Sequence, residues 1–195
     1  MHGSFSCGHD TTAAGLIWCL SLLSKHPEIR IKVSEELVRV LGEKTAEHSH
    51  LSKLVYLRQV IKEALRLYPP AIGTFAREAS ERIKIGGFDI PKGSYLYTFS
   101  YATHRDPRFF PDPLKFDPDR FSPEREEEIP AFAYFPFGAG PRSCIGMSFS
   151  MMEMTLVLAT ILQNGVFESQ DLDLEPEVSM SLRPKNRVKL RFTKI

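Results

Sequence analysis

Seven prolines recur from Asp106 to Pro136, a density that no long helix or strand can accommodate. Proline lacks the amide hydrogen that both elements need, and its ring collides with the preceding turn of a helix. The prolines are Pro107, Pro111, Pro113, Pro118, Pro123, Pro130 and Pro136. The chain must therefore cross this region as a long irregular segment. Its many aromatic residues favour an ordered segment that braces or carries a functional site.

Three helices are predicted ahead of this segment. Apolar residues recur at helical spacing over Ala13–Leu23, Ile29–Leu41 and Leu54–Leu65. We expect the polar cluster that holds Asp10 and Thr11 to lie at or near the start of the first helix. The second helix is expected to begin at Pro27 and to end at Gly42, and Pro69 stops the third.

Short strands and one further helix complete the expected architecture. Strands are predicted over Arg82–Ile85, Phe88–Ile90, Tyr95–Phe99 and, in the tail, Val188–Phe192. The first two flank Gly86-Gly87 and form a hairpin. A helix is expected from Cys144 to Asn164, with Gly165 as a left-handed stop. The predicted fold class is mainly α with small β-sheets (α+β).

Composition limits the possible partners and compartments. The 25 basic and 24 acidic residues nearly cancel, so we expect no nucleic-acid binding. The cysteines, Cys7, Cys19 and Cys144, match neither a zinc site nor a disulfide framework. We expect no signal peptide and no transmembrane segment, because the longest apolar run, Ala13–Leu23, is too short to span a bilayer.

One of these cysteines lies in a glycine-rich loop. Gly138, Gly140 and Gly146 surround Cys144, and glycine permits the tight backbone wrap that brings amides close to a sulfur. A helix start beside the cysteine adds partial positive charge, and both effects favour a thiolate metal ligand. The alternative is a cysteine that merely fills the core as a small apolar residue.

The spacing of Phe137, Gly140, Cys144 and Gly146 resembles the haem-binding motif F-x-x-G-x-x-x-C-x-G of the cytochrome P450 family. Three further segments resemble marks of that family in the expected order: Gly8–Thr11 its oxygen-activation segment, Glu63–Arg66 its E-x-x-R helix, and Phe116–Phe121 its meander. The resemblance covers nearly the whole chain but only the C-terminal part of the family's fold. Residues 1–195 are therefore expected to form a single partial domain.

The resemblance implies haem (iron protoporphyrin IX) as cofactor, with Cys144 as its axial metal ligand. Arg142 and Arg77 would pair with haem propionates. Further cofactor-binding positions implied by the resemblance are Phe137, Gly138, Gly146 and His104. For His104, a structural role inside the fold is an equal alternative.

A brace and a distal site are implied in the same way. Glu63 and Arg66 would face inward and join Arg120 below the cysteine loop, whereas a surface ion pair is the plainer reading of their i, i+3 spacing. Asp10 would relay protons and Thr11 would hydrogen-bond dioxygen at a kink of the helix, against simple helix capping as the alternative. The substrate pocket would include Ile72, Gly73, Thr74 and Phe75, for which an ordinary core role competes.

The function expected from the resemblance is a haem-thiolate monooxygenase that inserts one atom of dioxygen into a small apolar substrate. Gly8–Thr12 and Leu67–Pro70 resemble branches that act on fatty acids and sterols. A reductase or ferredoxin would supply electrons at a basic surface formed by Arg142, Arg105, Arg108 and Lys115. The alternative is a truncated, non-catalytic remnant or interaction module. The location stays open between the cytoplasm and, if an anchor precedes this sequence, a membrane.

Overall fold

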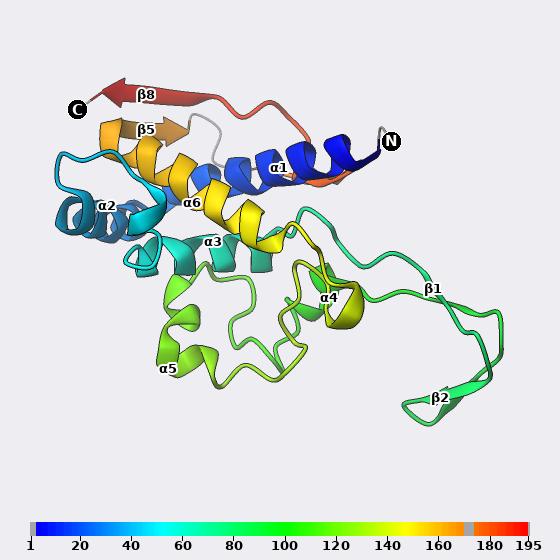
Figure 1. Ribbon diagram of the computed structural model, residues 1–195. Coiled ribbons are helices and arrows are strands. Elements are labelled where there is room, and N and C mark those ends of the chain that lie inside the picture. Colours follow the sequence, from blue (N-terminus) through cyan, green and yellow to red (C-terminus); the bar gives the residue numbers. More distant parts are fainter. Residues whose placement is uncertain (1–2, 170–173, 195) are drawn as a thin grey trace.

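Long helices form the body of the molecule (Figure 1). The computed structural model describes residues 3–169 and 174–194, and for residues 3–7 and 169 it describes the backbone alone. The four long helices are α1 (Gly3–Lys25), α2 (Pro27–Leu41), α3 (Val55–Leu67) and α6 (Met147–Asn164). With four two-stranded antiparallel sheets in the described residues, they confirm the predicted mainly α fold class.

The core lies where α1, α3 and α6 pack against one another. Its fully or almost fully buried side chains include Cys19, Leu23, Leu57, Ile61, Met154 and Leu158. Gly15 in α1 allows α6 to pack closely, because a Cβ at Gly15 would lie 2.9 Å from the Cε of Met154 in α6. Burial of the Cys19 thiol in this core raises its pKa, as expected for an inert structural cysteine. The side chain of Cys7, in α1, lies outside the described part.

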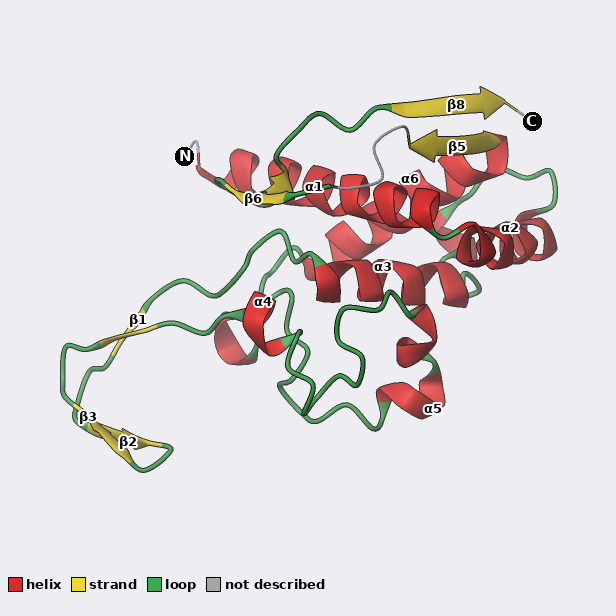
Figure 2. Cartoon of the chain, turned by 180° about the vertical axis from the view of Figure 1, so that it is seen from behind, coloured by secondary structure: helices red, strands yellow, loops and turns green. Residues whose placement is uncertain are grey.

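Residues between α3 and α4 (Ser100–Thr103) extend from the helical body as an arm (Figures 1 and 2). Strand β2 (Ile83–Ile85) pairs with β3 (Phe88–Ile90) across the predicted glycine turn, whose residues have φ of 57° and 86°. The strand predicted over Tyr95–Phe99 is shorter: it is β4 (Tyr95–Leu96), which pairs with β1 (Arg77–Glu78).

The C-terminal strands are joined to the helical body. Strand β5 (Gly165–Ser169) pairs with β8 (Leu190–Lys194), and β6 (Pro176–Val178) pairs with β7 (Leu182–Pro184). The Leu182 carbonyl accepts a hydrogen bond from Trp18 Nε1 at 2.9 Å, and the Leu182 amide donates to the Pro70 carbonyl at 2.8 Å. Gly165 has a φ of 176°, so the helix before it passes directly into an extended strand and the predicted left-handed stop is wrong.

The proline-rich segment contains only short helical turns, as its composition predicts. They are η2 (Pro118–Phe121) and α5 (Pro123–Glu126), while η1 (His48–His50) and η3 (Gly140–Arg142) are single turns elsewhere. Two predicted helix starts are wrong. α1 already includes Gly3, so Asp10 lies well inside it, and α6 begins at Met147, three residues after Cys144.

The N-terminus of α3 is capped by a carboxylate from another helix. The buried Glu36 side chain on α2 accepts hydrogen bonds from the Tyr56 amide at 2.8 Å and the Leu57 amide at 2.9 Å. Leu54, at the N-cap position of α3, has no oxygen in its side chain for this purpose. Glu36 therefore satisfies two amides that a helix start leaves open, where the helix dipole favours negative charge.

We expect Glu36→Ala to lower the free energy of unfolding by about 1–3 kcal/mol, because two amides at the start of α3 lose a charged acceptor. Glu36→Gln should lose less, since its single amide oxygen can still accept from one of them. Urea titrations followed by circular dichroism measure both. Equal stability of the alanine variant and the wild type would contradict the capping role.

Candidate functional site

The cysteine loop, residues 137–146, is shaped by backbone hydrogen bonds and two left-handed glycines. The Cys144 amide donates to the Phe137 carbonyl at 2.8 Å, which closes the loop. Gly138 and Gly140 each have a φ of 72°, where any side chain would be strained. Cys144 is a free, exposed cysteine at the end of this wrap. The core alternative therefore does not hold for Cys144.

The surroundings of the sulfur suit a thiolate that binds a flat apolar group. The start of α6, an 18-residue helix, lies three residues beyond Cys144, and helix N-termini attract negative charge. Ile145 is fully exposed, and Phe149 is 63% exposed in the first turn of α6. An open thiol beside apolar side chains, on a loop held by glycines, fits haem ligation in the chemistry of its donor.

A charged cluster supports the proline-rich segment; we call Glu63, Arg66 and Arg120 the brace. Arg66 makes two parallel hydrogen bonds to the Glu63 carboxylate, at 2.7 and 2.9 Å, and both side chains have no exposed surface. Arg120 Nε lies 3.4 Å from the same carboxylate. The structure thus brings together the three residues that the resemblance implies, and the surface-pair alternative is wrong.

Other polar groups of the brace bind the backbone in and next to the proline-rich segment. Arg66 donates to the carbonyls of His104, Pro113 and Lys115 at 2.6, 2.8 and 3.1 Å. Arg120 donates to the Asp112 carbonyl at 2.8 Å, and Glu63 accepts from the Asp117 amide at 2.9 Å. Burial raises the pKa of the Glu63 carboxyl, and the hydrogen bond and charge of Arg66 oppose that rise. A segment without regular structure is therefore held by side chains of α3.

His104 belongs to this interior network. Its side chain has no exposed surface, and its Nε2 accepts a hydrogen bond from the Phe135 amide at 2.9 Å. This burial and this hydrogen bond agree with the structural alternative for His104, while its cofactor-binding role stays a prediction.

Acid should destabilise the protein through this histidine. Burial, with smaller contributions from the charges of Arg66 and Arg105, lowers the pKa of His104 to about 3. The unfolded chain binds a proton near pH 6.5 while the folded chain does not, so stability is complete above that pH and falls toward pH 3. Between pH 6 and 4, the wild type should lose about 1 kcal/mol more per pH unit than His104→Gln, by denaturant titration. Parallel pH profiles would contradict this.

Asp10 and Thr11 lie within α1, not at its start. The helix is unbroken from Gly3 to Lys25, so these two residues do not cap its N-terminus. The next residue, Thr12, is buried and its hydroxyl lies 3.1 Å from that of Ser150 in α6. This contact places the Asp10–Thr11 turn beside the helix that follows the cysteine loop.

The candidate substrate segment runs next to the cysteine loop. A Cβ on Gly138 would lie 4.0 Å from Thr74 Cγ2, and the Thr74 amide donates to the Thr98 carbonyl at 2.9 Å. Gly73 has no room for a side chain, because its Cβ would lie 2.5 Å from the Thr98 carbonyl oxygen. Ile72 is partly buried and Phe75 is 85% exposed, so these residues do not form an ordinary core.

The candidate propionate partners and the basic surface differ in their contacts. Arg142 is exposed on the cysteine loop, whereas Arg77 donates to the carbonyls of Phe75 and Ala76 at 3.2 and 3.3 Å. Arg108 pairs with Asp106, and Arg105 stacks on a tyrosine ring. Two of the four side chains of the expected basic surface, Arg105 and Arg108, thus already contact other side chains of this chain.

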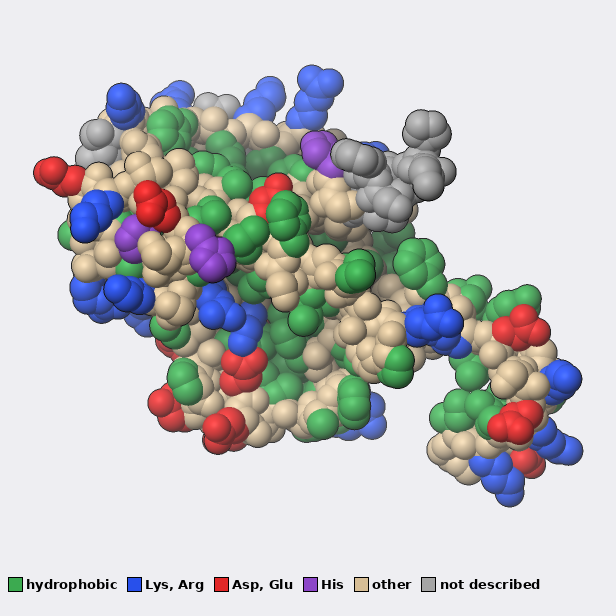
Figure 3. Space-filling model, in the orientation of Figure 1, with side chains coloured by type: hydrophobic (Ala, Val, Ile, Leu, Met, Phe, Trp, Pro, Cys, Tyr) green, Lys and Arg blue, Asp and Glu red, His purple; other side chains and the backbone are tan. Residues whose placement is uncertain are grey.

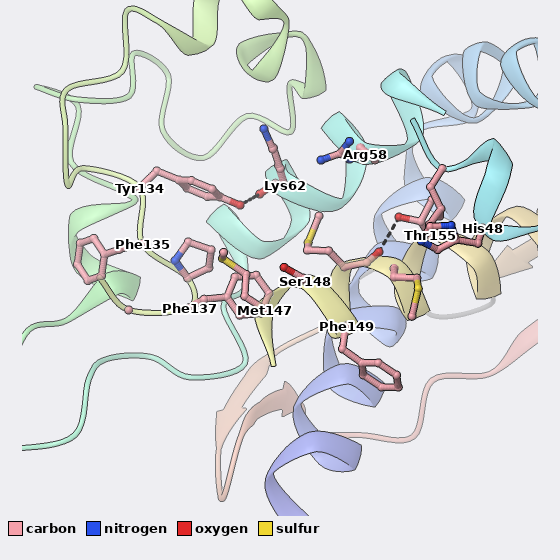
Figure 4. Close-up of a pocket in the computed structure, with 15 residues that line it drawn as sticks. His48, Arg58, Lys62, Tyr134, Phe135, Phe137, Met147, Ser148, Phe149 and Thr155 are labelled. Carbon is pink, nitrogen blue, oxygen red and sulfur yellow. Dashed lines mark hydrogen bonds between the residues drawn. The ribbon is translucent and has the colours of Figure 1, made fainter. Parts of the chain in front are cut away.

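A pocket of about 720 Å³ lies beside the cysteine loop (Figure 4). Its walls are residues 134–138, the start of α6, one side of α3 and residues near η1. The Tyr134 hydroxyl donates to the Lys62 carbonyl at 2.9 Å, and Lys62 pairs with Glu126. Arg58 adds a second basic residue at the wall. Sequence reasoning missed this pocket because four separate segments build it.

Hydrophobic side chains are also visible on the outer surface (Figure 3). They lie between the helices and the proline-rich segment, and along the arm. Several large side chains are more than half exposed, among them Phe75, Phe99, Phe149 and Val38. Within residues 3–169 and 174–194, no helix combines the length and the apolar character needed to cross a bilayer.

Comparisons with known proteins agree with this architecture. A family model described as cytochrome P450 matches residues 2–192. The human protein named cytochrome P450 4V2 is 44% identical over 191 residues, which cover 95% of this chain and 36% of that protein. Cytochrome P450 4c3 of Drosophila melanogaster is 41% identical with the same coverage.

A solved structure is similar throughout. The crystal structure of a cytochrome P450 named CYP102L1 superimposes with a TM-score of 0.90 at 30% identity, over 97% of this chain and 43% of that one. The chain thus spans about 36% of the length of the curated relatives that it matches.

Proposed function

Because the chain belongs to the cytochrome P450 family, we propose that it is the haem-ligating part of a haem-thiolate monooxygenase, in which the Cys144 thiolate would bind the haem iron. Members of this family use haem as their cofactor. The observation that carries the proposal is the free, exposed Cys144 on a loop that left-handed glycines and the Phe137 carbonyl hold in place. When bound, haem supplies the chemistry that splits dioxygen, and a thiolate ligand favours that cleavage by donating electron density.

Residues of this chain would bind the haem and support the loop that carries its ligand. Arg142, exposed beside Cys144, would bind a haem propionate, and Arg77 would be a second partner once freed from its own backbone. Phe137, Gly138 and Gly146 would shape the surface under the ring. The brace fixes the proline-rich segment that leads into the loop.

Proton delivery is assigned to α1. Asp10 would pass protons from solvent, and Thr11 would hold the reacting oxygen by a hydrogen bond. The Thr12–Ser150 contact supports this assignment, because it places that turn of α1 beside the helix that follows Cys144. The half-buried position of Asp10 leaves it open to water.

The substrate proposed is a small apolar molecule of the fatty-acid or sterol class. Ile72, Gly73, Thr74 and Phe75 would line its site, since Thr74 runs beside Gly138 of the cysteine loop and Phe75 is exposed. A reductase or ferredoxin would supply electrons. Its acidic surface would meet Arg142, Lys115 and Arg58, three exposed basic residues of this chain.

Turnover tests this function directly. The haem-loaded chain would be supplied with a flavoprotein reductase, a fatty acid or a sterol, and isotopically heavy dioxygen. We expect a product that carries one heavy oxygen atom per molecule, and none from Cys144→Ser. Absence of product from a haem-loaded chain would contradict the activity and support the alternative, a non-catalytic remnant or interaction module.

A further inference from the structure

We propose that His104 is a positioning residue that fixes the cysteine loop to the brace, through a hydrogen bond that its ring accepts from the Phe135 amide. The residue has contacts on both sides. Its carbonyl accepts from Arg66 Nη1 at 2.6 Å, and its ring Nε2 accepts from the Phe135 amide at 2.9 Å. One residue thus joins the buried Glu63–Arg66 pair to the strand of chain that enters the loop.

From Phe135 the connection continues to the cysteine through the backbone. The Phe135 carbonyl accepts from the Gly138 amide at 3.0 Å, which closes the turn where φ becomes positive. The Phe137 carbonyl then accepts from the Cys144 amide at 2.8 Å. The orientation of residues 135–137 therefore decides where the Cys144 sulfur lies.

A histidine at position 104 leaves a buried N–H group unpaired, and this energetic cost indicates that the hydrogen-bond acceptor of the ring is needed. Because Nε2 accepts a hydrogen bond, the proton of the neutral ring is on Nδ1. Nδ1 is buried and has no hydrogen-bond partner among the described residues. A leucine would fill the same space without a buried, unpaired N–H, so packing alone does not explain a histidine here. The ring is held in place by the neighbouring rings of Phe110, Tyr134 and Phe135.

The inference rests on the proposed role of Cys144, and its test separates the two. His104→Gln keeps an acceptor near the position of Nε2, whereas His104→Leu removes it. Amide hydrogen exchange, resolved by NMR in the haem-free chain, reports on the Phe135 and Cys144 amides. In His104→Leu we expect both to exchange about tenfold faster or more, the factor for loss of one hydrogen bond, with near-normal rates in His104→Gln.

A spectroscopic measurement extends the test to the cofactor. With haem, reduction and carbon monoxide, His104→Leu should give a smaller fraction of the red-shifted Soret band of thiolate ligation than His104→Gln. If His104→Leu fails to fold, His104→Asn replaces it, because its acceptor is chemically matched to that of glutamine but reaches less far.

Unchanged exchange at Phe135 and Cys144 in His104→Leu would overturn the proposal, as would equal impairment of the Gln and Asn variants. If the wild type shows no thiolate band, the proposed function fails, while amide exchange still decides the role of His104.

Discussion

Arg66→Lys and Glu63→Gln are each expected to abolish haem incorporation and to lower the free energy of unfolding by about 3–5 kcal/mol. The Glu63–Arg66 pair has no exposed side-chain surface, so breaking it leaves a buried charge or donor without its partner. Lysine cannot reproduce the two parallel bonds to Glu63 or the three bonds to backbone carbonyls. Haem absorbance per protein and denaturant titration measure the two effects.

The chain contains a matched control for this substitution. Glu36 and Arg39 have the same i, i+3 spacing on α2, but Arg39 is 73% exposed and lies 3.8 Å from the carboxylate. Arg39→Lys should change stability by less than about 1 kcal/mol and leave haem content unchanged. Normal haem content in both brace variants, or equal losses in Arg66→Lys and Arg39→Lys, would contradict the role of the brace.

The features that sequence predicted best depend on local pattern. Apolar periodicity placed the helices, and Gly86-Gly87 placed the hairpin, because both signals lie within a few consecutive residues. Helix ends were predicted less well. α1 continues toward Gly3 through residues without a clear apolar repeat, and Gly165 serves a strand rather than a cap.

The candidate site likewise contains some features that the sequence predicts and others that it does not. The cysteine loop follows from its glycines, and the brace followed from a family resemblance, since i, i+3 spacing alone favoured a surface pair. The role of His104 and the capping of α3 by Glu36 could not be predicted, because each depends on a partner about 20 to 30 residues away in sequence. For His104, the sequence left a structural role and a cofactor-binding role as equal alternatives, and its burial agrees with the first.

Replacing Cys144 should have the largest spectroscopic effect in the chain. Cys144→Ser removes the thiolate and leaves the backbone of the loop intact, because its glycines and the Phe137–Cys144 hydrogen bond do not involve the sulfur. We therefore expect complete loss of the thiolate band with little change in the free energy of unfolding, since the side chain is exposed. Cys19→Ser is the control: it alters the core, so it should destabilise the fold while any correctly folded fraction keeps the band.

The carbon monoxide spectrum of the reduced, haem-loaded chain tests the central claim most directly. A Soret band strongly shifted to the red in the wild type, and absent from Cys144→Ser, is the result expected if Cys144 is the axial thiolate ligand. A wild-type chain that binds haem without this band, or a band that persists in Cys144→Ser, would contradict it.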